Sequence, residues 1–330
     1  MKNKMTVLMT ALMVFVVCVT GCGNTQTAAE PAPAPAEETE SAPESPEPAP
    51  APESSEPAQA EEPETEADTR LLVVSFGTSY NDSRDITIGA IENDIAEAFP
   101  QYEVKRAFTA QIIIDKLKER DGLEIDNVTE ALDRAVADGV KKLIVQPTHL
   151  MNGLEYGDLA AELDTYKEDF EQIVLGEPLL TSDADYEAVI RAITDATKSY
   201  DDGETAIVFM GHGTEAESNQ VYATMQEKLG AAGFEHYYIG TVEAEPTIKD
   251  VMAEMAKHGS YRRVVLEPLM VVSGDHANHD MAGEDENSWK SIFKAEGYLV
   301  ECILKGLGEF PAIRNIYADH VQAAIEELSE

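Results

Sequence analysis

The chain has 330 residues, of which 24 are basic and 63 are acidic, and its formal net charge at pH 7 is −39. Proteins bind nucleic acid through basic surfaces, so a chain this acidic is a poor nucleic-acid binder. It also cannot collect anionic substrates by long-range attraction alone. We therefore expect no nucleic-acid partner.

The first 22 residues have the pattern of an export signal. Two lysines precede an uncharged apolar run over residues 5–19, which is shorter than the ~20 residues that a spanning helix needs. The run ends in Val19-Thr20-Gly21-Cys22, which resembles a bacterial lipobox. We expect a lipoprotein signal peptide over residues 1–22 and an extracytoplasmic protein anchored to the bacterial cell membrane by lipid on Cys22. The alternatives are an ordinary secretory cleavage site and a retained transmembrane anchor.

Residues 23–69 form a linker of mainly Ala, Pro, Glu, Ser and Thr, with 13 acidic residues and no basic one. Such a segment cannot bury enough apolar surface to offset its ordering entropy, so we expect it to be disordered. Proline and like charge extend it, which suits a spacer between a membrane and a folded domain. Of the total charge of −39, the linker supplies −13 and the leader +2, which leaves −28 for residues 70–330.

The folded part begins near Arg70 with alternating strands and helices. Short apolar, β-branched runs indicate strands, and apolar residues at helical spacing follow each of them. Strands are expected at Leu71–Gly77, Glu103–Phe108, Lys142–Gln146 and Gln172–Leu175. Helices are expected at Ile86–Phe99, Ile112–Glu119, Val128–Asp138 and Leu159–Tyr166. Near-continuous apolar strands separated by helices predict an α/β fold with a parallel sheet covered on both faces.

A second series of the same kind follows. Its strands are expected at Ala206–Met210, Tyr237–Gly240, Arg263–Glu267 and Leu299–Ile303. Its helices are expected at Tyr186–Ser199, Asn219–Leu229, Thr247–Lys257, Ser288–Lys294 and Ile313–Leu328. Residues 73–78 resemble 208–214, and residues 141–147 resemble 262–268, which indicates an internal duplication. We therefore expect two similar doubly wound, Rossmann-like halves, 70–182 and 183–330, around a central cleft.

Ligands of such folds bind beyond the carboxyl ends of the strands, so residues just after strands are the candidates for chemistry. They are His149, Glu155, His212, Glu243 and His276. The glycines that flank His212 would leave its imidazole unshielded, although the histidine could instead only cap the next helix. The two glutamates could be ordinary solvated surface residues. Two imidazoles and one carboxylate would suit Co²⁺, Ni²⁺, Fe²⁺ or Zn²⁺.

Several other chemistries lack their motifs. There is no P-loop, no Gly-x-Gly-x-x-Gly after the first strand and no Gly-x-Ser-x-Gly elbow around Ser75. Cys302 is the one cysteine beyond the leader and the lipobox, so the folded part cannot form an internal disulfide, and Cys302 is most simply a small buried hydrophobe.

Taken together, blocks of the folded part resemble the anaerobic sirohydrochlorin cobaltochelatase family. The blocks lie within Leu72–Tyr80, Arg106–Thr109, Asn152–Tyr156, Val208–Gly213, Gly274–Ala282 and Ser288–Lys290. The resemblance implies the class II chelatase fold and insertion of Co²⁺, or Fe²⁺, into a sirohydrochlorin-type tetrapyrrole during anaerobic cobalamin synthesis, with no cofactor beyond the substrate metal. It assigns His212, Glu243 and His276 to the metal, makes His212 the proton acceptor, and places His149 and Glu155 as further catalytic positions in the cleft.

Two features depart from that family. The lipobox and acidic spacer precede the domain, whereas many members are cytoplasmic, and His279 matches no assigned position. Export keeps a second interpretation open, a surface-anchored tetrapyrrole or metal-binding lipoprotein for uptake. A metal-storage protein is a third, but no dense His or Cys tract supports it. The sequence is also compatible with a homo-oligomer.

Overall fold

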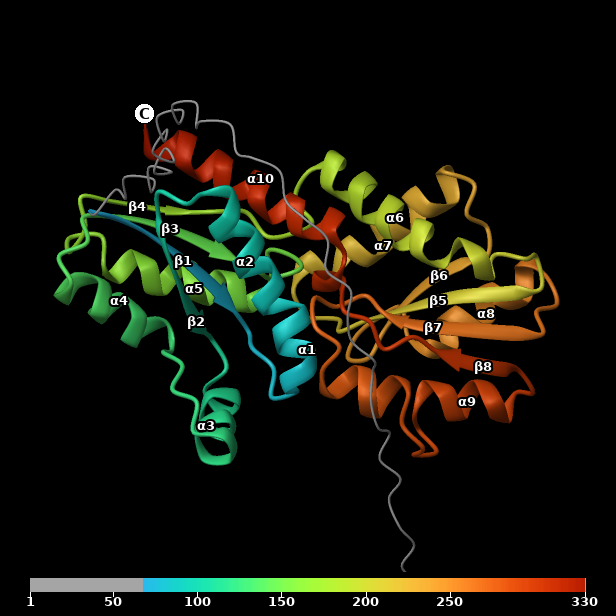
Figure 1. The fold of residues 1–330 in the computed structure, drawn as a ribbon. Coiled ribbons are helices and arrows are strands. Elements are labelled where there is room, and N and C mark those ends of the chain that lie inside the picture. The colour runs from blue at the N-terminus through green and yellow to red at the C-terminus, as the bar shows by residue number, and fades with distance from the viewer. Residues whose placement is uncertain (1–67, 330) are drawn as a thin grey trace, which may run out of the picture. The chain divides into compact units, whose positions relative to one another are not determined.

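The computed structural model describes residues 68–329 (Figure 1). The predicted signal peptide, Cys22 and almost all of the linker lie outside this part of the chain. Within it the strands form two four-stranded parallel sheets, with the orders β2-β1-β3-β4 and β6-β5-β7-β8. The strands are β1 Thr69–Ser75, β2 Glu103–Phe108, β3 Lys142–Pro147, β4 Gln172–Leu175, β5 Thr205–Gly211, β6 Tyr237–Thr241, β7 Arg263–Pro268 and β8 Leu299–Cys302. The predicted α/β class and the two similar halves are confirmed.

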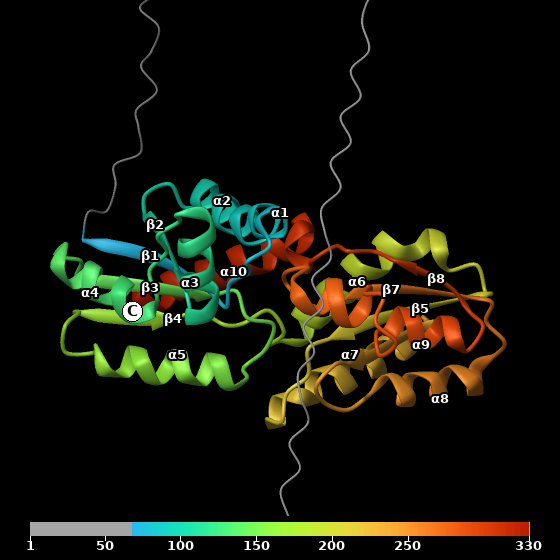
Figure 2. The ribbon, with the colours of Figure 1, turned by 90° about the horizontal axis from the view of Figure 1, so that it is seen from below.

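Helices cover both faces of each sheet (Figures 1 and 2). They are α1 Asn81–Ile86, α2 Ile88–Ala98, α3 Gln111–Asp121, α4 Val128–Ala137, α5 Leu154–Thr165, α6 Asp183–Thr197, α7 Gln220–Ala231, α8 Ile248–His258, α9 Trp289–Ala295 and α10 Pro311–Leu328. Apolar side chains of α2 and α10 pack on one face of the first sheet, and those of α4 and α5 pack on the other. The second sheet is covered by α6 and α7 on one face and by α8 and α9 on the other.

Three local predictions differ from the structure. The helix predicted over Ile86–Phe99 is split at Thr87, whose hydroxyl donates to the carbonyl of Ser83 at 2.5 Å. Helix α5 begins at Leu154, five residues before the expected start, because Gly153 precedes it in an extended conformation. The segment after His276, where no helix was predicted, forms a π-helical turn over Ala277–Met281.

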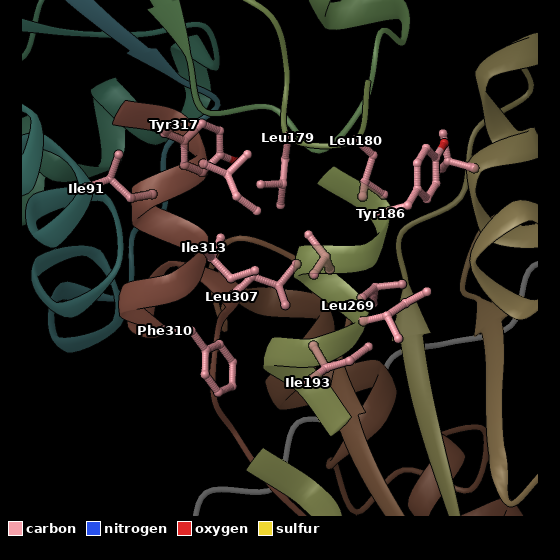
Figure 3. Packing of buried hydrophobic residues seen from close by; sticks show 14 of the residues in the cluster. Ile91, Leu179, Leu180, Tyr186, Ile193, Leu269, Leu307, Phe310, Ile313 and Tyr317 are labelled. Atoms are coloured by element: carbon pink, nitrogen blue, oxygen red, sulfur yellow. The ribbon is translucent and has the colours of Figure 1, made fainter. Parts of the chain in front are cut away.

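Helices α6 and α10 each pack away from the sheet whose last strand precedes them. Helix α6 follows β4 but packs against α7, and its Thr197 hydroxyl bonds the Tyr237 hydroxyl of β6 at 3.3 Å. Helix α10 follows β8 but packs against β3, β4 and α2 of the first half. Figure 3 shows side chains of both helices, among them Ile193 and Ile313, in one buried cluster. The two halves therefore share a core, while the predicted division at residue 182 stays a prediction.

The two sheets have matching registers. Val74 of β1 pairs with Pro147 of β3, and Met210 of β5 pairs with Pro268 of β7. The next backbone contact is also the same, because Thr148 N donates to Val74 O and Leu269 N donates to Met210 O, both at 2.8 Å. These registers support the predicted duplication and make Val74 the counterpart of Met210. In the part that the structure describes, no helix has the length and apolar character needed to cross a bilayer.

Candidate active site

A cleft of about 540 Å³ lies at the carboxyl ends of the two sheets. Its walls come from segments that follow strands, within residues 75–80 and 148–155 of the first half and within residues 212–215 and 270–276 of the second. All five predicted site residues, His149, Glu155, His212, Glu243 and His276, line it. The cleft therefore lies where the strand order predicts a ligand site.

Three of these residues converge. His212 follows β5, Glu243 follows β6 and His276 begins the π-helical turn after β7. One ligand atom from each lies within 4.8 Å of the others. The Nε2 atoms of His212 and His276 are each 3.9 Å from a carboxylate oxygen of Glu243, and the two rings meet edge to face with centroids 4.8 Å apart. Two imidazole nitrogens and a carboxylate are a donor set for a first-row divalent ion.

Hydrogen bonds fix the tautomer of both imidazoles. Nδ1 of His212 donates to the carbonyl of Gly213 at 2.8 Å, and Nδ1 of His276 donates to a carboxylate oxygen of Asp280 at 2.7 Å. A carbonyl and a carboxylate can only accept, so Nδ1 carries the hydrogen in each ring. The Nε2 lone pairs are left free beside Glu243, as metal coordination requires.

Asp280 was not among the predicted site residues. It lies four positions after His276 on the same turn, and it holds the ring through the 2.7 Å bond. This kind of carboxylate–histidine contact fixes the orientation of a metal-binding imidazole. The i, i+4 spacing of a histidine and an aspartate was the available signal in the sequence.

The two glycines that flank His212 allow the tight turn that presents its imidazole, as the sequence predicts. A Cβ on Gly211 would lie 2.2 Å from the Tyr222 ring, so no side chain fits there. Gly213 has φ +88°, and a Cβ on it would lie 2.8 Å from the backbone of Ala244. The hydroxyl of Tyr222 accepts from Gly213 N at 3.2 Å, and burial raises the pKa of Tyr222 to about 12. The turn that presents the imidazole is therefore tightly fixed.

His149 and Glu155 lie on the wall of the first half, outside the group of three converging ligands. Both ring nitrogens of His149 are buried and have no hydrogen-bond partner among the described residues. Burial lowers the pKa of His149, although the charge of Glu155 acts in the opposite direction. The backbone is held by Leu179 N, which donates to His149 O at 2.9 Å, and by the Tyr317 hydroxyl, which donates to Thr148 O at 3.0 Å. Glu155 is exposed in the first turn of α5.

The charged groups in the cleft are unbalanced. Glu155, Glu215, Glu243 and Asp275 line it, and none of the described residues that line it is a lysine or an arginine. The surplus of carboxylates favours the approach of a divalent cation. A ring-shaped ligand that carries several carboxylates, such as a sirohydrochlorin-type tetrapyrrole, would therefore be bound by contacts to its ring and by neutral hydrogen-bond donors.

Comparison with known proteins shows the family of this chain. A family model described as Cobalt chelatase (CbiK) matches residues 69–326. The chain belongs to the CbiK cobalt chelatase family. It is 39% identical over 260 residues to the sirohydrochlorin cobaltochelatase of Salmonella typhimurium strain LT2, covering 79% of this chain and 97% of the relative. It is 31% identical over 262 residues to the sirohydrochlorin cobaltochelatase CbiKC of Nitratidesulfovibrio vulgaris strain Hildenborough, covering 79% and 92%.

A solved structure shows the same fold. SirB from Bacillus subtilis with Fe³⁺ superposes with a TM-score of 0.55 at 13% identity, covering 80% of this chain and 98% of that one. The resemblance to the sirohydrochlorin cobaltochelatase family that was read from the sequence is thus confirmed, and the protein is a metal chelatase. The roles of the individual site residues remain predictions, although the structure brings the three metal-ligand candidates of this CbiK protein together.

Proposed function

We propose that this CbiK-family chelatase inserts Co²⁺ into sirohydrochlorin and that His212, Glu243 and His276 receive the ion. The observation that carries the proposal is the convergence of two free Nε2 atoms and a carboxylate in the cleft. Both relatives above are named for this reaction. Fe²⁺ is the second metal to test, and Ni²⁺ and Zn²⁺ also suit the donor set.

The reaction exchanges protons for metal. Two pyrrole N–H protons leave the macrocycle for each divalent ion that enters, so the charge stays balanced. His212 is suited to accept one of them, because its Nε2 becomes free when the ion passes to the ring nitrogens and its Nδ1–H stays bound to Gly213. Glu155 and His149 are the further catalytic candidates, on the opposite wall, and exposed Glu155 can pass a proton on to water.

We also propose that the enzyme is extracytoplasmic and anchored to the membrane through lipid on Cys22. The lipobox-like motif and the acidic, proline-rich spacer support this proposal. The substitution Cys22→Ala is expected to move the protein from the membrane fraction to the soluble fraction of the cell. Unchanged fractionation of this variant would remove the anchor from the proposal and leave the chemistry untouched.

An anaerobic absorbance assay tests the reaction. Purified protein is mixed with metal-free sirohydrochlorin and Co²⁺, Fe²⁺, Ni²⁺ or Zn²⁺, and the spectral change is compared with a protein-free control. Catalysed conversion that is fastest with Co²⁺ is the expected result. Tight binding of the tetrapyrrole without turnover would contradict the proposal and would support an uptake lipoprotein instead.

A further inference from the structure

The wall opposite the metal-ligand candidates contains an aromatic counterpart of His212. Because Val74 and Met210 occupy equivalent register positions, the residues two places further on, Phe76 and His212, are also equivalent. Both side chains line the cleft. At this equivalent position the first half therefore has a phenyl ring and the second half has an imidazole.

The backbone around Phe76 repeats the turn around His212. Gly77 has φ +97° and Gly213 has φ +88°. Ala110 N donates to Phe76 O at 3.3 Å, and Glu243 N donates to His212 O at 2.9 Å. A Cβ on Gly77 would lie 2.6 Å from the Phe108 ring, so this turn is also tightly packed. Phe76 is thus held in the cleft by a fixed backbone.

The first half has one carboxylate at the positions equivalent to Glu243 and His276. The mirrored hydrogen bonds make Ala110 the counterpart of Glu243, and alanine offers no ligand. Counting from the paired prolines, Pro147 and Pro268, Glu155 stands in the place of His276. This wall therefore keeps one carboxylate and has an aromatic ring in place of an imidazole.

Phe76 is also unusually exposed for a phenylalanine, at 50% of its surface. Of the large apolar residues that are exposed in the described chain, Phe76 and Leu154 line the cleft, and Leu154 is 62% exposed. An exposed apolar group at a ligand site is informative, because burying it against a ligand returns the free energy that its exposure costs. A flat conjugated ring is the ligand that gains most from a phenyl face.

We infer that Phe76 stacks on the tetrapyrrole face that points away from His212, so that the macrocycle lies between an aromatic wall and a metal-binding wall. This inference rests on the proposed function, since it takes the tetrapyrrole as the occupant of the cleft. In this arrangement the metal enters from the second half, while Phe76 fixes the ring at the depth where its nitrogens meet the ion. Phe76 is a binding residue for the ring and has no role in holding free metal.

The test compares Phe76→Ala, Phe76→Tyr and a control, Leu299→Ala, in the full-length protein. Leu299 is 63% exposed at the start of β8 and is not part of the cleft. Three quantities are measured: the Kd for metal-free sirohydrochlorin by fluorescence, kcat and KM for Co²⁺ insertion, and the Kd for Co²⁺ without tetrapyrrole. Phe76→Ala is expected to raise the tetrapyrrole Kd and KM about tenfold and to leave the Co²⁺ Kd unchanged. Phe76→Tyr should restore binding, and Leu299→Ala should match the wild type.

If Phe76→Ala left the tetrapyrrole Kd and KM unchanged, the inference would be overturned. Turnover by the wild-type protein would in that case still support the proposed function. A parallel loss of Co²⁺ binding would also overturn it, because it would show a structural effect on the metal-binding wall. If the wild type itself bound no sirohydrochlorin, the proposed function would fail first, and the inference would fail with it. Melting curves of each variant check that the fold is intact.

Discussion

The two halves of this chelatase share a scaffold and differ in what they place at its edge. Both sheets have the same strand order and register, and both have a glycine turn after the central strand. The second half has His212, Glu243 and His276 at these positions, and all three line the cleft. The first half has Phe76, Ala110 and Glu155 there, of which Phe76 and Glu155 line it. A duplicated fold can therefore remain symmetric while its cleft becomes asymmetric, because the three metal-ligand candidates converge on one wall only.

The sharpest way to break this asymmetry is His212→Phe, which gives the second half the residue of the first. The change removes one of two imidazoles from the metal-ligand candidates and the proposed proton acceptor with it. The expected result is a fall in kcat for Co²⁺ insertion of at least about 100-fold. Single-turnover absorbance measurements under anaerobic conditions would show it.

His258→Ala is the matched control for that variant. His258 is a histidine on α8 that pairs with Glu254 and does not line the cleft. It should retain wild-type turnover. Full turnover in His212→Phe would show that metal insertion does not depend on His212. The difference between Phe76 and His212 would then not explain which wall receives the metal.

A smaller effect is expected from Asp280→Asn, because Asp280 hydrogen-bonds His276 without being one of the three metal-ligand candidates. Loss of the carboxylate weakens the hydrogen bond that holds Nδ1–H and with it the orientation of Nε2. Affinity for Co²⁺ is expected to fall about 10- to 100-fold by calorimetry. The control is Glu254→Gln, since Glu254 contacts His258 in a similar histidine–carboxylate pair outside the cleft, at 3.1 Å. Equal Co²⁺ affinities of Asp280→Asn and wild type would exclude the orienting role.

Much of this arrangement could be predicted from the sequence, because strand positions and strand exits follow apolar runs. The bounds of β2 and β4 agree with the prediction, and the rule of strand exits selected the three residues that converge. The packing of α10 on the first half could not be predicted, since an amphipathic pattern shows that a face is buried but not against which sheet it packs. The break at Thr87 was hidden because apolar spacing continues across it.

Within the site, sequence reasoning did not find Asp280 or Phe76. Asp280 acts on His276 through a π-helical turn, and the sequence there carries no periodic apolar signal for such a turn. Phe76 looks like an ordinary apolar residue at the end of a strand until the register shows that His212 is its counterpart. Both are therefore consequences of the way the chain is placed in space.

A last difference between the halves lies in their cores. Gln146 of β3 and Glu267 of β7 occupy the equivalent register position and are both buried. The Gln146 amide donates to Pro147 O at 2.8 Å and to Glu177 O at 3.0 Å. One side-chain oxygen of each residue, Gln146 Oε1 and Glu267 Oε2, is buried without a hydrogen-bond partner among the described residues, so the difference lies in the amide of Gln146 and the ionisable carboxyl of Glu267. Burial raises the pKa of Glu267 from its usual 4.5 to about 8, with Glu309 adding to the shift and Lys305 opposing it.

The raised pKa of Glu267 makes the free energy of unfolding depend on pH. Between about pH 4.5 and 8 the folded protein keeps a proton on Glu267 that the unfolded chain releases, so the free energy of unfolding falls as the pH rises through this window. Glu267→Gln removes that dependence. Relative to wild type, its free energy of unfolding should rise by about 1.4 kcal/mol per pH unit at most between pH 6 and 8, and then level off.

Urea unfolding at pH 6, 7, 8 and 9 would measure the difference, and the reverse exchange supplies the control. Gln146→Glu places an ionisable carboxyl at the equivalent buried position of the first half, so this variant should lose stability relative to wild type as the pH rises. A pH-independent difference between Glu267→Gln and wild type would mean that Glu267 is already ionised in the folded protein. In that case the buried counterparts would differ in charge at neutral pH, and Lys305 would be the residue that compensates for Glu267.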